Sequence, residues 1–271
     1  MDTLHPSARP ADPTVVITRV AEHLWHALED DQVVGRGNAS RRADGRLFIS
    51  IDSWHEAVFH LLAAAMRTDL PRPLFSVVDE ADADLTAAWL LAGFSIGRRE
   101  RGYLLPTDPG VTGLGTALLP ADVTLIPAGE ADEARLRVLD RTIRDEITAT
   151  VGWQTMPAEV IALPHGDTVV DPSRYAVAAQ GTDYVGLLRL ATVTRQPRIG
   201  LLAVRADQRR RGIARALLGH TLNALHHNGT SAAWAEVNEA NAGATGLFEA
   251  AGARAVSCNL ELVQRLELVQ R

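Results

Sequence analysis

The sequence predicts an α/β protein made of two domains in tandem. Its 271 residues suit two domains of ordinary size, and strand-like and helix-like segments alternate in a similar order in both halves. A hydrophobic share of 46% beside a charged share of 22% is typical of a globular protein with a sizeable core. Gly, Pro, Thr and Asp are concentrated between Pro106 and Pro120, which predicts a linker at 107–121 between domains at 14–106 and 122–265.

Helical and strand-like periodicities alternate after the linker. A helix is expected at 132–149, because Leu136, Leu139, Ile143 and Ile147 recur at helical spacing and acidic residues gather at its start. Further helices are expected at 212–227 and 242–251, and strands at 123–128, 175–179, 184–193, 199–204, 231–237 and 253–263.

The first half repeats the later part of this pattern. Strands are expected at 47–52, 74–79 and 95–105, and helices at 54–66 and 85–92. Equivalent points are 152 residues apart for Leu47 and Ile199, 157 for Leu74 and Ser231, and 159 for Gly93 and Gly252. A duplicated unit is therefore predicted, and the extra residues of the second copy fall in the interval that includes 207–211.

The two ends of the chain are expected to lie outside the domains. Residues 1–13 hold three prolines and little apolar content, which predicts a loose tail. At the other end LELVQR occurs twice, at 260–265 and 266–271. The second copy, 266–271, is read as an extension, a remnant of expression or a partner-binding strand, and these alternatives stay open.

Charge and cysteine content limit the classes of partner and the cellular compartment that are expected for this protein. The net charge is −6, and the concentrated positive charge is the run 209–211, so a nucleic-acid partner is not expected and a cationic substrate is favoured. Cys258 is the single cysteine, which excludes an intramolecular disulfide and a multi-cysteine zinc site. No signal-peptide core or membrane-length apolar run is recognised, so a cytoplasmic protein without a membrane partner is expected.

Residues 199–218, IGLLAVRADQRRRGIARALL, join a predicted strand to a predicted helix through a glycine turn. Such a turn presents consecutive N–H groups at the helix start, and these form a concavity for phosphate oxygens. Gly212 lets a ligand approach because it has no Cβ, and Ala214 is also small. Four arginines can neutralise phosphate charge: Arg209, Arg210, Arg211 and Arg215. The alternative is that Gly212 only starts a helix beside a solvated charge run.

Two motifs in this half resemble those of the GCN5-related N-acetyltransferase (GNAT) superfamily. Arg209-x-x-Gly212-x-Ala214 is similar to the signature Q/R-x-x-G-x-G/A, and it follows Leu202-Ala203-Val204 at the usual distance. The second motif, E-V-x-x-x-N followed by an aromatic residue and a glycine, is represented by Glu236, Val237, Asn241, Phe248 and Gly252. The resemblance covers about 123–263, and in the first half only the order of elements supports it.

The resemblance implies a tandem pair of mixed-sheet GNAT-like domains. The second would have splayed central strands and the phosphate loop, and the first would be a degenerate copy. Acetyl-CoA is the implied cosubstrate, with no metal. The implied cofactor-binding set is Leu202, Val204, Arg209, Arg210, Arg211, Gly212, Ile213, Ala214, Arg215, Asn241 and Phe248.

The family's chemistry implies roles for two residues of the second half. The N–H of Leu202 would polarise the thioester carbonyl and stabilise the oxyanion. Glu236 would take the proton of the attacking amine, or alternatively only orient substrate or end a strand.

The sequence departs from the family pattern at two positions. Phe248 stands where the family's usual general acid is a tyrosine, and Arg198 stands where another frequent base is a glutamate. Loss of a general acid costs on the order of 10² in rate unless it is replaced. Tyr175, Tyr184 or a residue of the first half could replace it.

Residues upstream of the loop are candidates for the acceptor side. Asp145 and Glu146 either attract an ammonium group or are exposed acids of a helix. Trp153 is either a substrate-facing aromatic residue or a core anchor.

The predicted function is transfer of acetyl from acetyl-CoA to a primary amine of a small molecule, with an aminoglycoside or amino sugar favoured. The alternatives are a protein or peptide N-acetyltransferase and a non-catalytic acyl-CoA-binding module. The first half is expected to shape the acceptor cleft or a dimer contact, so a homodimer is one expected assembly.

Overall fold

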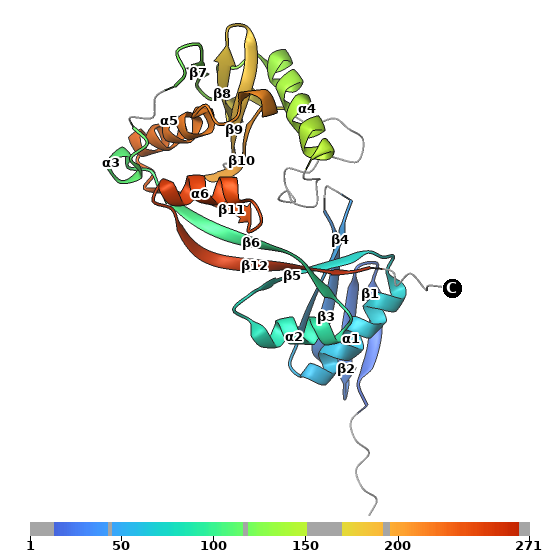
Figure 1. Cartoon of the computed structure of the whole chain (residues 1–271). Coiled ribbons are helices and arrows are strands. Elements are labelled where there is room, and N and C mark those ends of the chain that lie inside the picture. The colour runs from blue at the N-terminus through green and yellow to red at the C-terminus, as the bar shows by residue number, and fades with distance from the viewer. Residues whose placement is uncertain (1–13, 43–44, 116–118, 151–169, 192–195, 266–271) are drawn as a thin grey trace, which may run out of the picture.

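The computed structural model describes residues 14–42, 45–115, 119–150, 170–191 and 196–265 (Figure 1). Their strands form a 12-stranded mixed sheet in the order β1-β2-β3-β4-β5-β12-β6-β11-β10-β9-β8-β7. Figure 1 shows two lobes, joined by the long twisted strands β6 and β12. The expected α/β class with tandem mixed sheets is confirmed. The expected tail at 1–13, the extension at 266–271 and Trp153 lie outside the described residues.

The first lobe is built from five strands and two helices. Its strands are β1 (Val16–Ala21), β2 (Leu24–Glu29), β3 (Gln32–Arg41), β4 (Leu47–Ser53) and β5 (Leu74–Asp79). Its helices are α1 (Glu56–Asp69) and α2 (Ala83–Leu91). β1 to β3 form an antiparallel meander that continues into β4. These first three strands were not among the elements predicted from the sequence.

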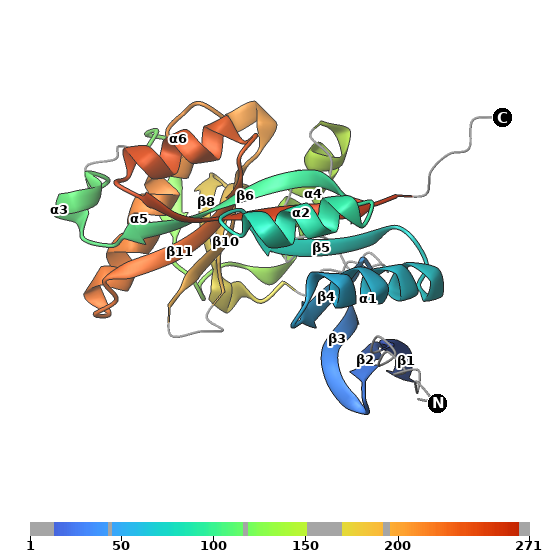
Figure 2. The same ribbon diagram turned by 90° about the horizontal axis from the view of Figure 1, so that it is seen from below.

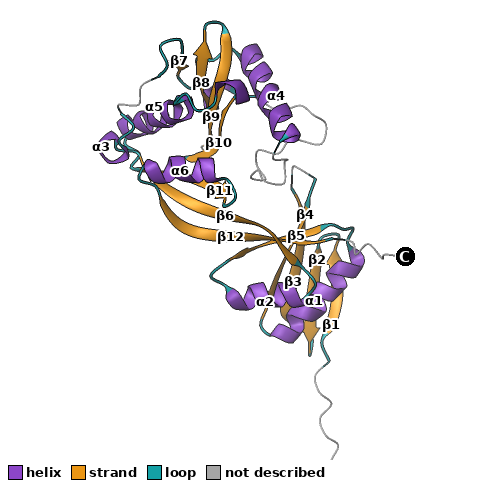
Figure 3. Cartoon of the chain, viewed as in Figure 1, coloured by secondary structure: helices purple, strands orange, loops and turns teal. Residues whose placement is uncertain are grey.

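The second lobe contains the longer helices. Its strands are β7 (Thr124–Ile126), β8 (Tyr175–Gln180), β9 (Asp183–Ala191), β10 (Arg198–Val204) and β11 (Ala232–Asn238). Its helices are α4 (Glu133–Ala149), α5 (Ile213–His227) and α6 (Ala242–Ala250), and the short α3 (Pro109–Thr112) lies in the predicted linker. Figure 3 shows α4 and α5 flanking the strands of this lobe.

β6 (Ser95–Pro106) and β12 (Arg254–Gln264) each belong to both lobes. β6 lies between β12 and β11, and β12 lies between β5 and β6, so the last strand of each half pairs with a strand of the other half. The two strands run antiparallel through the middle of the molecule in Figure 2. The halves therefore exchange their last strands. The domain bounds predicted from the sequence do not include this exchange, and they remain a prediction.

Side-chain packing follows the exchange. Leu260 and Leu262 of β12 are buried in the core of the first lobe. Tyr103 and Leu105 of β6 are buried in a core of the second lobe, under α5 and α6. A separate core lies under α4 on the other face of the sheet, with Leu136 and Leu139 fully buried or nearly so. Each half thus needs apolar side chains that the other half supplies.

Both lobes contain one parallel pair of strands that separates after two residues. β4 pairs with β5 at Leu47↔Leu74 and Phe48↔Phe75, and β10 pairs with β11 at Arg198↔Trp234 and Ile199↔Ala235. The other paired strands are antiparallel. The same splay in both lobes supports the predicted duplication and confirms the splayed central strands.

Candidate functional site

The chain turns sharply between β10 and α5. β10 ends at Val204, a short 3-10 turn covers Ala206–Gln208, and α5 starts at Ile213. The backbone is left-handed at Arg210, with φ 65°, and at Gly212, with φ 84°. Glycine adopts this conformation without cost, whereas it costs an arginine roughly 1–2 kcal/mol. Such strain is typical of loops that are held in shape for binding.

The turn leaves backbone donors at the start of α5. The first hydrogen bond of the helix runs from the N–H of Ala216 to the carbonyl of Gly212, at 3.0 Å. The N–H groups of Ile213, Ala214 and Arg215 therefore have no acceptor within the helix. They lie at the positive end of the helix dipole, where an anion is stabilised. The predicted phosphate loop consequently has the geometry of an anion site.

Arg209 and Glu146 tie the start of the loop to α4. Nε of Arg209 donates to the carbonyl of Val204 at 3.2 Å, and its guanidinium lies 3.3 Å from Oε2 of Glu146. That carboxylate also accepts the N–H of Ala206 at 2.9 Å. Glu146 was predicted to attract an ammonium group or to be an exposed acid of a helix, and it instead holds the loop.

Arg211 ties the other side of the loop to the segment before β7. Its guanidinium contacts Oδ1 of Asp122 at 2.6 Å, and Asp122 in turn accepts a 2.6 Å hydrogen bond from Gln180 of β8. The hydrogen bond from Arg211 lowers the pKa of Asp122 below its ordinary value. Arg211 is thus engaged by the protein itself.

Arg210 and Arg215 differ from these two arginines. Both are exposed, and neither forms an ion pair with any residue that the structure describes. Their guanidinium groups are available to a phosphate without breaking an existing pair. The four arginines that the sequence grouped together therefore divide into two anchors and two groups open to a ligand.

The edge of β10 that faces β11 is unpaired beyond Ile199 within the described residues. Leu202 and Val204 lie on this stretch, and their other edge pairs with Leu188 and Gly186 of β9. A strand edge of this kind offers N–H and C=O groups to an extended ligand. The structure therefore places both predicted arm-binding residues where an extended chain can be added.

Glu236 lies at the first position after β10 and β11 separate. Ala233, Ala235 and Val237 point into the core under α5 and α6, so Glu236 points to the opposite face of the sheet. There its Oε2 contacts the guanidinium of Arg198 at 2.5 Å. The residue that departs from the family pattern is thus the partner of the predicted base.

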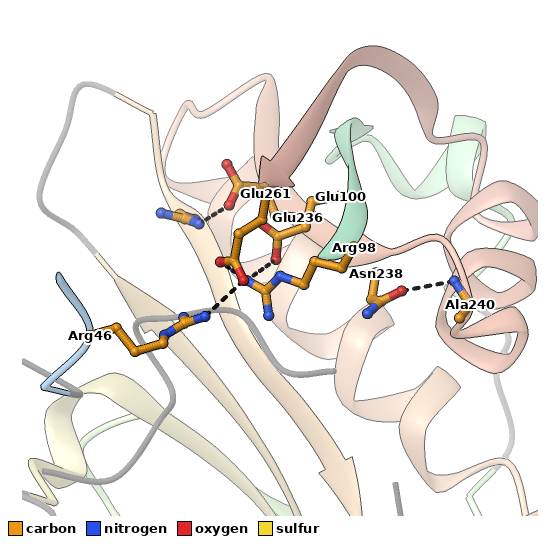
Figure 4. A network of polar contacts seen from close by, with 8 residues as sticks. Arg46, Arg98, Glu100, Glu236, Asn238, Ala240 and Glu261 are labelled. Atoms are coloured by element: carbon orange, nitrogen blue, oxygen red, sulfur yellow. Dashed lines mark hydrogen bonds and ion pairs between the residues drawn. The ribbon is translucent and has the colours of Figure 1, made fainter. Parts of the chain in front are cut away.

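A second group of ion pairs links the exchanged strands on the same face of the sheet (Figure 4). Arg98 of β6 contacts Glu100 at 2.8 Å and Glu261 of β12 at 3.5 Å. Arg46, just before β4, contacts the other oxygen of Glu261 at 2.8 Å. Sequence reasoning missed this network, because no local motif connects residues of three segments so far apart in the chain.

Two cofactor-binding predictions from the second motif have structural roles in α6. Asn241 caps the helix by accepting the N–H of Ala244 at 3.1 Å. Phe248 is buried, and its ring packs edge-on against Tyr103 with centroids 6.1 Å apart. The Tyr103 hydroxyl donates to Glu249 at 3.1 Å, and burial is the main cause that raises its pKa. Cofactor contacts of Asn241 and Phe248 stay predictions.

The two tyrosines considered as replacement general acids, and the single cysteine, have other surroundings. Tyr175 is buried under α4, and the hydroxyl of Tyr184 accepts the N–H of Asp132. Burial raises the pKa of Cys258 to about 11, so its nucleophilic thiolate is scarce near neutral pH. Among the described residues, no cluster of His, Cys, Asp and Glu is arranged to hold a metal ion. None of the described helices combines the length and apolarity needed to cross a membrane.

Comparisons with known proteins agree with this geometry. Residues 141–253 match the model of the acetyltransferase (GNAT) family. A GCN5-related N-acetyltransferase from Sphaerobacter thermophilus has a similar structure, with a TM-score of 0.63 and 14% identity over 92% of this chain and 82% of that one. No curated protein matches the sequence.

Two further solved structures are similar. A tandem GNAT protein from the clavulanic acid biosynthesis pathway has a TM-score of 0.58 and 14% identity, over 94% of this chain and 84% of its own. A fungal glucosamine N-acetyltransferase region has a TM-score of 0.59 and 11% identity, over 88% of this chain and 32% of its own. Residues 141–253 are therefore similar to the GNAT acetyltransferase family, within a chain that has the fold of a tandem GNAT protein.

Proposed function

We propose that this protein transfers acetyl from acetyl-CoA to a primary amine of a small molecule. The observation that carries the proposal is the loop at the start of α5. Three N–H groups there have no acceptor within the helix, two exposed arginines of the loop form no ion pair with a described residue, and the strand before the loop has an edge that is unpaired within the described residues. The phosphates of coenzyme A match the donors of the loop, and its extended pantetheine arm matches the edge of β10.

The reaction proposed here is a direct transfer. The amine nitrogen attacks the thioester carbonyl, a C–N bond forms, and the C–S bond breaks after a tetrahedral intermediate. The N–H of Leu202 would stabilise the negative charge on the carbonyl oxygen. The amine proton would pass to Glu236. The sulfur of coenzyme A would leave as a thiolate, and a thiol pKa of about 8.5 makes the thiolate an adequate leaving group.

No covalent acyl-enzyme is proposed. Cys258 lies on β12, and the raised pKa of about 11 leaves its thiol protonated at neutral pH. A direct attack also explains why the site needs an acceptor face beside the splay, because the amine and the thioester must be present together.

The first lobe is proposed to shape the acceptor side rather than to bind a second coenzyme. Its splayed strands lead directly into α1, whose first turn begins with Glu56 and has neither glycine nor arginine before it. A carboxylate at this position opposes a phosphate. Through the exchange of β6 and β12, the same lobe instead contributes Arg98 and Glu100 to the face that carries Glu236.

Amino sugars or aminoglycosides are the proposed acceptors. The net charge of −6 favours cationic molecules, and one protein with a similar fold is described as a glucosamine N-acetyltransferase region. A protein or peptide acceptor is the alternative, and it would need an open groove of peptide width.

A non-catalytic acyl-CoA-binding module is a second candidate. Two observations favour it: Glu236 is engaged by Arg198, and Phe248 has no proton to donate. Both candidates bind acetyl-CoA, but only the enzyme transfers its acetyl group to an amine.

The test measures binding and turnover separately. Calorimetry with acetyl-CoA is expected to show binding, and incubation with a panel of small amines and peptides is expected to release thiol with the small amines. Binding without thiol release across the panel would replace the enzyme with the binding module. Release with peptides alone would replace the small-molecule acceptor.

A further inference from the structure

Trp234 lies beside Glu236, on the face of the sheet where the acceptor amine is proposed to bind. The two residues are separated by Ala235, whose side chain points into the opposite core, so the indole and the carboxylate share one face of β11. Trp234 is half-buried, and in the register of the parallel pair it stands beside Arg198. An aromatic ring, a carboxylate and a guanidinium therefore form one patch at the point where the strands separate.

The glycine of the neighbouring strand fixes the position of the ring. Gly102 of β6 pairs directly with Glu236, and a Cβ at Gly102 would lie 2.5 Å from Cη2 of Trp234. No real Cβ approaches so closely, so the indole can occupy this space beside β6 only because residue 102 is a glycine. A glycine of the first half of the chain thus provides the space that this tryptophan of the second half occupies.

A hydroxyl group lies at the same place. Ser257 of β12 pairs with Gly102, and its Oγ also lies within contact distance of the space that a Cβ there would occupy. This Oγ is buried and has no hydrogen-bond partner among the described residues. The hydroxyl and the indole therefore share the space over Gly102.

We propose that Trp234 is a specificity-determining residue that stacks against the ring of a cyclic amine acceptor, such as an amino sugar. The inference rests on the proposed function and names the part of the acceptor that the protein recognises. One face of a pyranose ring is a sheet of C–H groups, which packs on an indole, while its hydroxyl and ammonium edge can meet Glu236 and Arg198. An open-chain amine has no such face and gains little from the ring.

The test compares acceptors rather than total activity. With glucosamine and kanamycin, Trp234→Leu is expected to raise KM about tenfold, the loss of one aromatic stacking contact. KM for the open-chain amine 2-amino-1,3-propanediol and the Kd for acetyl-CoA are expected to stay within about twofold. Gly102→Ala is expected to raise KM for the ring acceptors in the same way with the tryptophan still present, because the new Cβ displaces the indole from its position.

Matched controls separate this role from a structural one. Trp54→Leu makes the same substitution at a residue that is 71% exposed in the first lobe, and it is expected to leave both KM values unchanged. Trp234→Phe is expected to restore most of the preference for ring acceptors. Equal losses with ring and open-chain acceptors, or no change with either, would overturn the proposal.

The outcome remains decisive if the protein proves inactive. Acetyl-CoA binding without thiol release would refute the proposed function alone, and glucosamine binding to the CoA-loaded protein would then be measured by calorimetry. Weaker binding to Trp234→Leu than to wild type would support the stacking role. Absence of glucosamine binding to wild type, or equal binding to both, would overturn it.

Discussion

Replacing Glu261 with glutamine tests whether the exchanged strands are held together by a desolvated ion network. Glu261 accepts from Arg46 at 2.8 Å and lies 3.5 Å from Arg98, which comes from the strand beside it. The side chains of Glu261 and Arg98 are 8% and 5% exposed, and that of Arg46 is 18% exposed. The substitution removes the negative charge and keeps the shape of the side chain.

The expected loss of stability is about 3 kcal/mol. Removing one partner of a buried ion pair costs about 3–5 kcal/mol. The lower end applies here, since Arg98 keeps its 2.8 Å contact with Glu100 and the side chain of Arg46 is partly exposed to solvent. β12 also belongs to both lobes, so we expect one cooperative unfolding transition for the whole chain.

The assay is equilibrium unfolding in urea, compared with a matched variant. Glu133→Gln removes the carboxylate of the Glu133–Arg137 pair on α4, in which both side chains are more than 50% exposed. That variant is expected to change the free energy of unfolding by no more than about 0.5 kcal/mol. Equal effects of the two substitutions, or separate transitions for the two lobes in wild type, would refute the reasoning.

Three further predictions concern the site. Glu236→Gln is expected to lower kcat about 10²-fold or more with the Kd for acetyl-CoA unchanged, and a rise in KM alone would show that Glu236 only orients the acceptor. Arg210→Gln is expected to weaken acetyl-CoA binding more than Arg211→Gln, because Arg211 already contacts Asp122; calorimetry that ranks them in reverse would contradict the division of the arginines. The folded state holds the proton of Cys258 up to a pKa of about 11, against 9.0 ordinarily, so wild type is expected to lose stability relative to Cys258→Ser only as pH rises from 9 toward 11. Parallel thermal-unfolding curves for these two proteins across that range would show that the raised pKa is wrong.

Local patterns predicted most elements of the second half. The strand at 199–204 and the helix at 212–227 were expected, and the structure has Arg198–Val204 and Ile213–His227. Strand alternation, helical spacing and a left-handed glycine are all properties of neighbouring residues, so the sequence reveals them directly. The glycine turn between β10 and α5 was predictable for the same reason.

β3 escaped prediction because the packing of a helix, and not alternation, selects its residues. β3 contains Gly35 and Gly37, which interrupt a strand pattern. In the structure α1 lies so close that a Cβ at Gly37 would come within 2.5 Å of Sδ of Met66, and one at Gly35 within 2.7 Å of Val58. The glycines record the approach of a helix that the sequence pattern alone does not place.

The exchange of strands was also beyond local reasoning. The partner of a strand depends on the whole topology, and the alternation of β6 and β12 is compatible with either neighbour. Their lengths, 12 and 11 residues, are about twice the common strand length and are the one available signal. The pairing of Glu236 with Arg198 depends on the splay between two strands, so it too became visible only in the structure.

The most direct measurement of the central claim is calorimetric titration of acetyl-CoA into wild type and Gly212→Val. The account predicts saturable binding of acetyl-CoA to wild type below millimolar concentration. It predicts at least about tenfold weaker binding for Gly212→Val, because a β-branched residue is strongly disfavoured at a φ of 84°. Absence of wild-type binding at millimolar acetyl-CoA, or equal binding to both proteins, would contradict the claim that this turn holds the phosphates.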